Sequence, residues 1–156
     1  MACAEFALEN LPTKGLFREL KNHLGNMTDP ISDMLIRIKN AGAVGKKTAD
    51  FGYSKLKWEI AKILENNQYL GEVSKKGKKN KKLIETTLRY DEDGTPKISD
   101  VKRISKPSRR IYFGHRQIHS VKSGFGIAVY STTQGLLTDQ EARKQKLGGE
   151  LLFEIR

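Results

Sequence analysis

GIAVYSTTQGLLTDQEARKQKLGGE (residues 126–150) is the stretch that decides how the C-terminal part of the chain folds. Its apolar beginning predicts a strand, which breaks into a run of hydroxyl residues and a glycine. A short helix is predicted next, because Thr138 and Glu141 have the spacing of a capping box. Two glycines and an acid then lead into a last strand candidate, GELLFEI.

The first of these strands begins slightly earlier, as GFGIAVYST (124–132), and one further strand candidate precedes it, RRIYFG (109–114). Before them, SKPSRR (105–110) reads as a boundary, because Pro107 removes a donor from any strand ladder and restricts the residue before it. We therefore expect a C-terminal domain that is mostly β with one short helix.

The N-terminal half shows helical periodicity twice. In DPISDMLIRIKNAG (29–42), Asp29 suits the N-cap, Pro30 suits the first helical position and Gly42 suits the end. A polar loop, GKKTAD (45–50), follows. In the helix predicted for residues 29–42, the residues expected to face inward are Ile31, Met34, Leu35, Ile38 and Ala41.

A second helix is predicted from Ser54 through SKLKWEIAKILENN. Leu56, Ile60, Ile63 and Leu64 are expected to face inward, with Lys55, Lys57 and Lys62 on the surface. The period then changes to two in KLIETTLRY (82–90), which predicts a strand, and KISDVKRIS (97–105) reads as another strand with a bulge.

These elements predict an α+β fold of two small domains. The first is an N-terminal α/β domain (27–104) with two helices on a short sheet, and the second is the C-terminal β-rich domain (105–156). Residues 1–26 stand apart as an extension that is a short helix or disordered, since an isolated helix of this length is not stable in water.

The charge of the chain points to a polyanionic partner. Its 156 residues contain 29 Lys and Arg against 18 Asp and Glu, a net charge of +11. Nucleic acid is the first expectation and an anionic membrane surface the second. The single cysteine, Cys3, excludes an internal disulfide framework and a Cys-rich zinc site. No apolar run has the length of a membrane span and no basic signal region is present, so the cytoplasm is expected.

Six of the eight residues in KKGKKNKK (75–82) are lysines. Self-repulsion favours an extended loop or hairpin tip that contacts phosphates, and a merely solvated loop is the alternative. Lysine is a point charge, so the run would supply affinity without sequence choice. The candidate contacts here are Lys75, Lys76, Lys78 and Lys79.

From Val101 to Thr138 the sequence has seven basic residues and no acid. In the strand candidate RRIYFG, Arg110 and Tyr112 share one face. Guanidinium and ring planes can stack on unpaired RNA bases, which favours RNA as the ligand. The alternative is that Tyr112 only covers an edge of the core.

Catalytic and metal chemistry have weaker support. His115 and His119 have the spacing of helical metal ligands, but no third ligand is near and the segment lies between strands. A hydrolase using Ser131 remains an alternative function, although the local sequence is not a G-x-S-x-G elbow. A DNA-binding regulator is another alternative, although no helix pair with a tight turn is visible.

Five segments occur together in a recognisable order and spacing: DPISDMLIRIKNAG, SKLKWEIAKIL, KPSRRIYFG, GIAVYSTTQGLLTDQEAR and GGELLFEI. In these the chain, from about Met27 to Arg156, resembles the family of the eighth protein of the small ribosomal subunit in its bacterial form. The resemblance implies a structural, non-enzymatic protein that binds the central domain of the small-subunit rRNA and aids platform assembly. It implies neighbouring small-subunit proteins as further partners, with no cofactor, membrane or small-molecule substrate.

The resemblance also implies which residues contact RNA: Ser131, Thr132, Thr133, Gly135, Gly148, Gly149, Glu150, Arg109, Arg110, Tyr112 and Lys55. Hydroxyls can read 2′-hydroxyls or base edges, and glycines let the backbone approach RNA closely. Glu150 can accept from base amino groups. The alternatives are strand-end capping for Ser131 and Thr132, and a surface salt bridge from Glu150 to Arg143 or Lys144.

Three features depart from the family pattern. Residues 1–26 precede the usual family start, so they are either lineage-specific or a sign that Met27 is the start. Ser108 replaces the usual glycine after Lys-Pro, which can alter the aim of Arg109 and Arg110. The lysine run is richer than in typical members, and we expect it to reach RNA that they do not.

Overall fold

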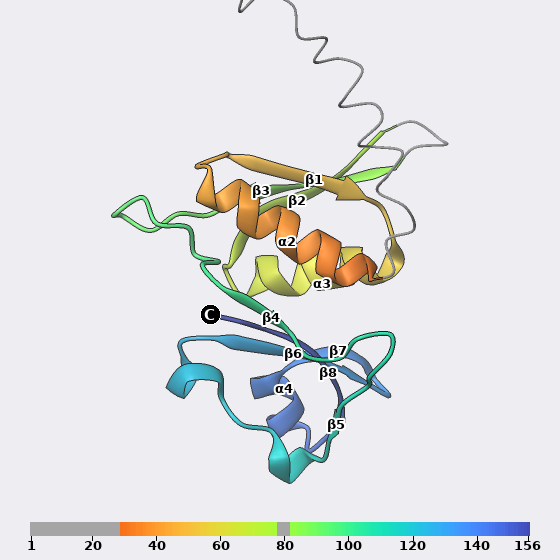
Figure 1. Ribbon diagram of the computed structural model, residues 1–156. Coiled ribbons are helices and arrows are strands. Elements are labelled where there is room, and N and C mark those ends of the chain that lie inside the picture. The colour runs from red at the N-terminus through yellow and green to blue at the C-terminus, as the bar shows by residue number, and fades with distance from the viewer. Residues whose placement is uncertain (1–28, 78–81) are drawn as a thin grey trace, which may run out of the picture.

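The computed structural model describes residues 29–77 and 82–156 (Figure 1). The expected helix within residues 1–26, as well as Lys78 and Lys79, lies outside the described residues. The elements are α2 (Pro30–Ala43), β1 (Thr48–Gly52), α3 (Lys55–Asn66), β2 (Leu70–Lys76), β3 (Leu83–Leu88), β4 (Val101–Arg103), β5 (Tyr112–Phe113), the 3₁₀ turns η1 (His115–Gln117) and η2 (Val121–Gly124), β6 (Ile127–Thr132), β7 (Gly135–Thr138), α4 (Asp139–Lys144) and β8 (Gly149–Ile155).

These elements stack in layers (Figure 1). A three-stranded antiparallel sheet, in the order β1-β3-β2, lies on one side of α2 and α3. A five-stranded sheet, in the order β4-β8-β6-β7 with β5 also paired to β8, lies on their other side. The short helix α4 and the 3₁₀ turns cover the outer face of this second sheet. The α+β fold class is confirmed.

Helix α2 begins as its sequence predicts. The Asp29 carboxylate accepts hydrogen bonds from the backbone N–H groups of Ile31 and Ser32, and Pro30 is the first helical residue. The predicted end at Gly42 was slightly early, because the helix continues to Ala43. Gly42 has a packing role instead: a Cβ there would lie 3.0 Å from the Cβ of Pro96.

Helix α3 starts after Ser54 as expected, but two of its side chains were assigned wrongly. Leu56 is 39% exposed, whereas Lys57 is buried, with 8% of its surface exposed. The Lys57 ammonium lies 3.9 Å from the carboxylate of Asp33 in α2. An opposite charge on the neighbouring helix thus turns Lys57 inward, and hydrophobic periodicity carries no information about such a partner.

The first sheet contains a strand that the sequence analysis took for a loop. Residues 48–50 of GKKTAD belong to β1, which pairs with β3 from Thr48 opposite Thr87 onward. The strand predicted at 82–90 is confirmed in its centre as β3. The lysine run begins inside β2, since Lys75 and Lys76 pair with residues of β3. The hairpin alternative is therefore the one that fits the described part of this run.

In the second sheet, the predicted strands GFGIAVYST and GELLFEI correspond to β6 and β8. The capping box is confirmed: the Thr138 hydroxyl accepts from the Glu141 N–H, and the Glu141 carboxylate accepts from the Thr138 N–H. Strand β7, which forms a hairpin with β6, was not predicted. The strands expected at 97–105 and 109–114 are present but shorter than predicted, as β4 and β5.

One hydrophobic cluster joins the two halves of the chain. It combines buried residues of α2, α3 and the first sheet with Ile127, Val129, Leu152, Phe153 and Ile155 of the second sheet. A smaller cluster lies on the other face of that sheet, around Tyr130 and Leu151. Strand β4 precedes the expected boundary at 104/105 yet hydrogen-bonds to β8; the division into domains stays a prediction.

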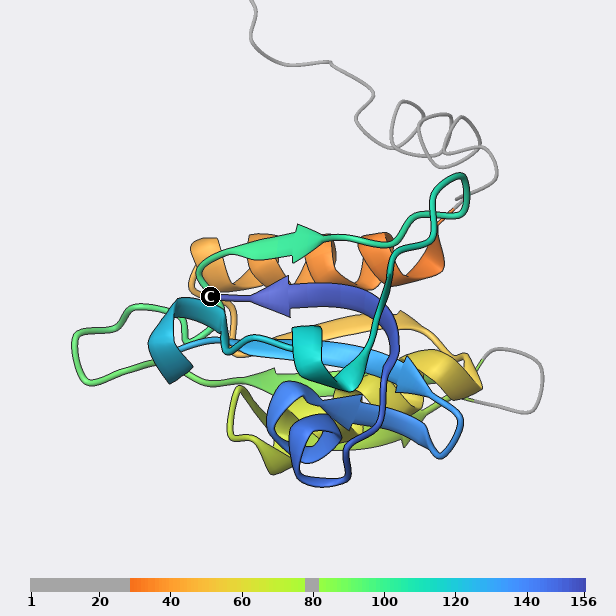
Figure 2. The same ribbon diagram turned by 90° about the horizontal axis from the view of Figure 1, so that it is seen from below.

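Several connections gather at one end of the molecule. In both views the segments 53–55, 75–77, 104–111 and 132–135 lie at the right-hand end, where β1, β4 and β6 terminate (Figures 1 and 2). We call this the hairpin end. The segment that joins β3 to β4 lies at the opposite end, as does the C-terminus.

Candidate nucleic-acid interface

Three predicted RNA-binding residues form a row across adjacent strands. Tyr112 of β5 lies opposite Glu150 of β8, and Glu150 lies opposite Ser131 of β6. Directly paired residues of antiparallel strands place their side chains on the same face of the sheet. Tyr112 is 68% exposed, which excludes the alternative that it only covers a core edge. We call Tyr112, Glu150 and Ser131 the polar row.

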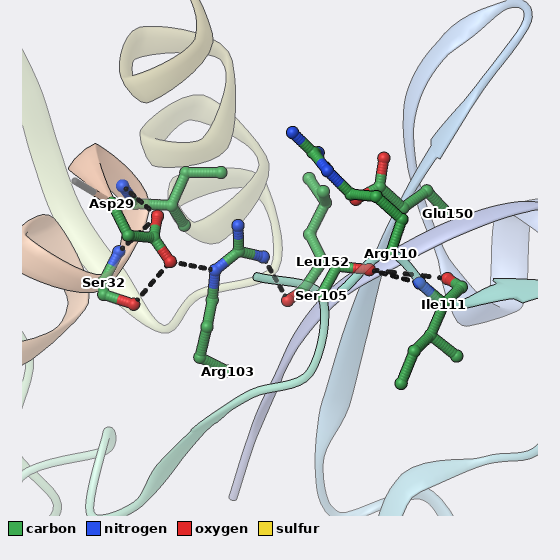
Figure 3. A network of polar contacts seen from close by, with 9 residues as sticks. Asp29, Ser32, Arg103, Ser105, Arg110, Ile111, Glu150 and Leu152 are labelled. Carbon is green, nitrogen blue, oxygen red and sulfur yellow. Dashed lines mark hydrogen bonds and ion pairs between the residues drawn. The ribbon is translucent and has the colours of Figure 1, made fainter. Parts of the chain in front are cut away.

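Arg110 belongs to the same site through an ion pair with Glu150. A guanidinium N–H donates to the Glu150 carboxylate at 2.8 Å (Figure 3). This hydrogen bond, together with the charge of Glu150, raises the pKa of Arg110 above its ordinary value. The partners suggested for Glu150 from sequence, Arg143 and Lys144, were wrong. Arg143 instead pairs with Asp139 at 3.0 Å.

The turn between β6 and β7 uses one of the predicted hydroxyls for its own structure. The Thr132 hydroxyl donates to the carbonyl of Gly135 at 2.9 Å and accepts from the N–H of Gln134 at 3.2 Å. Gly135 has φ +117°, a backbone region that favours glycine. The Thr132 hydroxyl therefore caps this turn, and its contact with RNA stays a prediction. Thr133 is exposed at the tip of this turn.

Ser131 differs from Thr132 in this respect. None of the side-chain hydrogen bonds found within residues 29–77 and 82–156 uses the Ser131 hydroxyl, and the residue is half-buried beside Glu150. A hydroxyl can donate one hydrogen bond and accept two. The hydrogen-bonding capacity of the Ser131 hydroxyl is consequently available to a ligand.

Packing within the protein itself requires glycine at positions 148 and 149. A Cβ on Gly149 would lie 2.3 Å from the carbonyl oxygen of Ser131, and one on Gly148 would lie 2.6 Å from that of Phe113. Both distances are far below a tolerable contact, so these glycines let β8 begin tightly against its neighbours. Contact of their backbone with RNA stays a prediction.

A tight basic loop stands next to the polar row. Lys106 and Arg109 exchange two backbone hydrogen bonds of 2.8 and 3.0 Å, which close a turn around Pro107 and Ser108. The base of the loop is fixed by the buried Ser105, whose hydroxyl accepts from the N–H of Ile111 at 3.0 Å (Figure 3). Arg109 is exposed on this loop.

A partly buried ion pair fixes the second sheet to helix α2 close to this site. The Arg103 guanidinium donates to Asp29 at 2.8 Å and also to the carbonyl of Leu152 in β8 (Figure 3). Burial on its own would raise the pKa of Asp29, but hydrogen bonds from Arg103 and Ser32 outweigh it and hold the pKa below its ordinary value. The helix N-cap thus also connects the two layers.

The predicted lysine contacts have different surroundings. Lys55 is exposed at the start of α3. Lys75 lies over the rings of Tyr53 and Trp58, whereas Lys76 forms an ion pair with Glu85. All three lie in segments at or next to the hairpin end, but they are contributed by the first sheet and α3 rather than by the second sheet (Figures 1 and 2).

The geometry bears on the alternative functions as well. Strand β1 lies between α2 and α3, so these helices do not form a helix-turn-helix pair. Within the described residues, no three His, Cys, Asp or Glu side chains gather as a metal site, and no hydrogen bond joins Ser131 to a histidine. No helix in the part of the chain that the structure describes is both long and apolar enough to cross a bilayer.

The two ion pairs at and near this site were not predicted from the sequence. Arg110 and Glu150 are 40 residues apart, and Asp29 and Arg103 are 74 apart. Each pair depends on which strands or layers are neighbours, and the sequence does not display this arrangement. The only available signal was the position of Glu150 as a lone acid next to a basic region.

Comparison with known proteins gives a consistent result. The family model described as "Ribosomal protein S8" matches residues 29–155. Three similar proteins bear the name small ribosomal subunit protein uS8. That of Syntrophus aciditrophicus is 42% identical over 130 residues, that of Dictyoglomus turgidum 46% over 129, and that of Persephonella marina 44% over 134. In each case the match covers 83% of this chain and 98% of the relative.

Proposed function

Because the chain belongs to the ribosomal protein S8 family, we propose that it is a structural component of the small ribosomal subunit that binds small-subunit rRNA through the polar row. It is not an enzyme, and it works in the cytoplasm as part of the ribosome, beside other small-subunit proteins. Its expected target is the central domain of the rRNA, where binding aids assembly of the platform.

The observation that carries the RNA-binding proposal is the polar row with Arg110 paired to it. Tyr112 offers an exposed ring on which a base can stack, and Ser131 offers a hydroxyl for a 2′-hydroxyl or a base edge. Glu150 can accept from a base amino group. These groups lie side by side on adjacent strands, so one RNA surface can meet all of them at once.

The basic surroundings of the row would supply affinity rather than selectivity. Arg109 and Arg110, next to the row, can neutralise phosphates, and the net charge of +11 attracts any nucleic acid. Phosphate contacts position RNA but do not read its sequence. Discrimination between RNAs is therefore assigned to the uncharged and acidic members of the polar row.

A filter-binding experiment tests this proposal. The protein is titrated against a transcript of the rRNA central domain and against an unrelated RNA duplex, at several salt concentrations. We expect binding to both RNAs to weaken as salt rises, and the central-domain transcript to keep at least a tenfold advantage. Equal affinity for both RNAs at every salt concentration would contradict specific rRNA binding.

A second measurement addresses the cellular assignment. The protein should co-sediment with small ribosomal subunits after a wash in high salt, because hydrogen bonds and stacking persist when charge attraction is screened. Release of the protein into the free fraction by that wash would indicate a loosely attached basic protein rather than a structural component of the subunit.

A further inference from the structure

Outside the polar row, one lysine is held over two aromatic rings. The Nζ of Lys75 in β2 lies 4.3 Å from the ring centre of Trp58 and 5.2 Å from that of Tyr53. The Nζ of Lys62 lies 5.2 Å from the same Trp58 ring. Ammonium groups at such distances are attracted to the faces of aromatic rings. We call Lys75, Lys62, Trp58 and Tyr53 the lysine–aromatic cluster.

The sheet geometry explains why Lys75 reaches these rings. It follows the buried Val73 by two residues in β2, so both side chains are on the face covered by α3. Lys76 is on the opposite face, where it pairs with Glu85. Two consecutive lysines of equal charge therefore have different surroundings, an aromatic one for Lys75 and an acidic one for Lys76.

The cluster leaves Lys75 charged and positioned. Within the described residues Lys75 contacts no carboxylate, whereas Lys62 shares its charge with Glu65 at 2.6 Å. A lysine side chain normally loses much rotational freedom when it binds a phosphate. The rings restrict Lys75 beforehand, so less freedom remains to be lost on binding, which is the advantage of a preorganised contact.

We propose that the lysine–aromatic cluster is a second RNA-contact site, in which Lys75 binds a backbone phosphate and Lys62 is the flanking cation. This inference rests on the proposed rRNA binding and adds a contact made by the other sheet. The end of β2 and the start of α3 lie at the hairpin end, as does the β6–β7 turn beside the polar row (Figures 1 and 2). A single folded rRNA domain can thus reach both sites.

Trp58 provides the test, because it is the only tryptophan in the chain. Titration with the central-domain transcript should change its fluorescence, since a phosphate bound to the Lys75 ammonium alters the charge next to the indole. The midpoint of this change should equal the midpoint measured by filter binding. In Lys75→Ser the fluorescence response should disappear, and affinity should fall about threefold to tenfold. The slope of log affinity against log salt should flatten by about 0.7 to 0.9, the value of one phosphate contact.

Lys97→Ser is the matched control, because it removes the same charge from the segment that joins β3 to β4, at the opposite end of the molecule. We expect it to change affinity less than twofold and to leave the fluorescence response intact. Lys75→Arg keeps a cation over the rings and should retain both affinity and response. Thermal melting of the three variants verifies that each is folded.

Two results would overturn the second site while rRNA binding by the polar row stands. One is that Trp58 fluorescence does not respond to a transcript that binds, and the other is that Lys75→Ser and Lys97→Ser lose equal affinity. Equal losses would mean that the lysines act only through total charge. Failure of the wild-type protein to bind the transcript at all would overturn both proposals.

Discussion

Glu150 shows how one residue can both limit and direct RNA binding. Its carboxylate is only 12% exposed and holds the Arg110 guanidinium, which is half-exposed. In the free protein the pair masks a cation that would otherwise attract any phosphate. When RNA binds, Arg110 can turn to a phosphate while Glu150 accepts from a base. The same pair then supplies affinity through Arg110 and selectivity through Glu150.

Substituting Glu150→Gln tests this exchange. The released Arg110 should strengthen binding to an unrelated duplex and steepen its salt dependence by up to about 0.9, the slope for one phosphate. The affinity for the central-domain transcript should increase less than this, or decrease, because an acceptor for a base amino group is weakened. Parallel filter-binding titrations measure the ratio of the two affinities. An equal gain on both RNAs would mean that Glu150 only masks Arg110 and reads no base.

Ser131 and Thr132 are neighbours with different expected roles, although the sequence alone predicts the same role for both. Ser131→Ala should weaken binding to the cognate transcript by about 1 to 3 kcal/mol, because a partner on the RNA loses its hydrogen bond. The melting temperature should stay nearly unchanged, since the structure shows no use of this hydroxyl within the described residues.

Thr132→Ala is the comparison for Ser131→Ala. It removes two hydrogen bonds within the β6–β7 turn and should lower the free energy of unfolding by about 0.5 to 1.5 kcal/mol. Calorimetry combined with filter binding separates the two cases. If Ser131→Ala left cognate binding intact, the capping alternative would hold for Ser131 also.

At the scale of single residues, the sequence predicted which residues are functional better than it predicted which residues are in contact. Its resemblance to a known family placed Arg110, Tyr112, Ser131 and Glu150 among a larger set of RNA contacts, and the structure brings these four side chains to one place. The sequence misplaced Lys57, because a buried lysine needs a carboxylate from another element. Only the packing of α2 against α3 supplies that carboxylate.

Among the elements, the N-terminus of α2 carries the contact that fixes the layers together. Asp29→Asn keeps an N-cap but loses the charge that binds Arg103. We expect the free energy of unfolding at neutral pH to fall by about 1 to 3 kcal/mol, because the remaining guanidinium is mostly buried without its partner.

The acid side of the stability profile should change in the same variant. Since the pKa of Asp29 is lower in the folded protein, its contribution is fully present above the ordinary pKa of an aspartate. This contribution disappears as pH falls below about 4, through the folded-state pKa. Denaturant unfolding of Asp29→Asn should show a weaker pH dependence in that window.

Asp100→Asn is the control for Asp29→Asn, because Asp100 pairs with Lys39 at the surface, where both side chains are about half exposed. It should change stability little at neutral pH. Equal effects of the two substitutions would contradict the assigned role of the Asp29–Arg103 pair.

Elements with a clear period or a capping box were predictable, whereas short strands were not. Helix α2, helix α3 and strands β6 and β8 have apolar patterns that a helix or strand requires. Strands β1 and β7 have five and four residues, and each is held by a longer partner strand rather than by its own pattern. Composition near β1 is polar because one face of the first sheet is exposed.

For the whole molecule, the arrangement of layers decides which segments meet. Placing α2 and α3 between two sheets creates one continuous core and brings connections from both halves to the hairpin end (Figures 1 and 2). Sequence patterns predicted two units but not their relative placement, because that depends on contacts between residues far apart in the chain. We therefore expect this end of the molecule to face rRNA, and that claim underlies both proposed RNA contacts.

Directed hydroxyl-radical cleavage tests that claim most directly. Cys3 is first replaced by Ser, so that a single new cysteine can be introduced. One variant carries Thr133→Cys in the β6–β7 turn, and the other carries Asp93→Cys in the segment that joins β3 to β4, at the opposite end. An iron chelate is attached to the new cysteine of each variant. Each protein is bound to the central-domain transcript, and the cleaved positions are mapped. We predict a discrete cluster of strong cleavage from position 133 and weak or no cleavage from position 93. Strong cleavage from position 93 with none from position 133 would contradict the assignment of the hairpin end to rRNA.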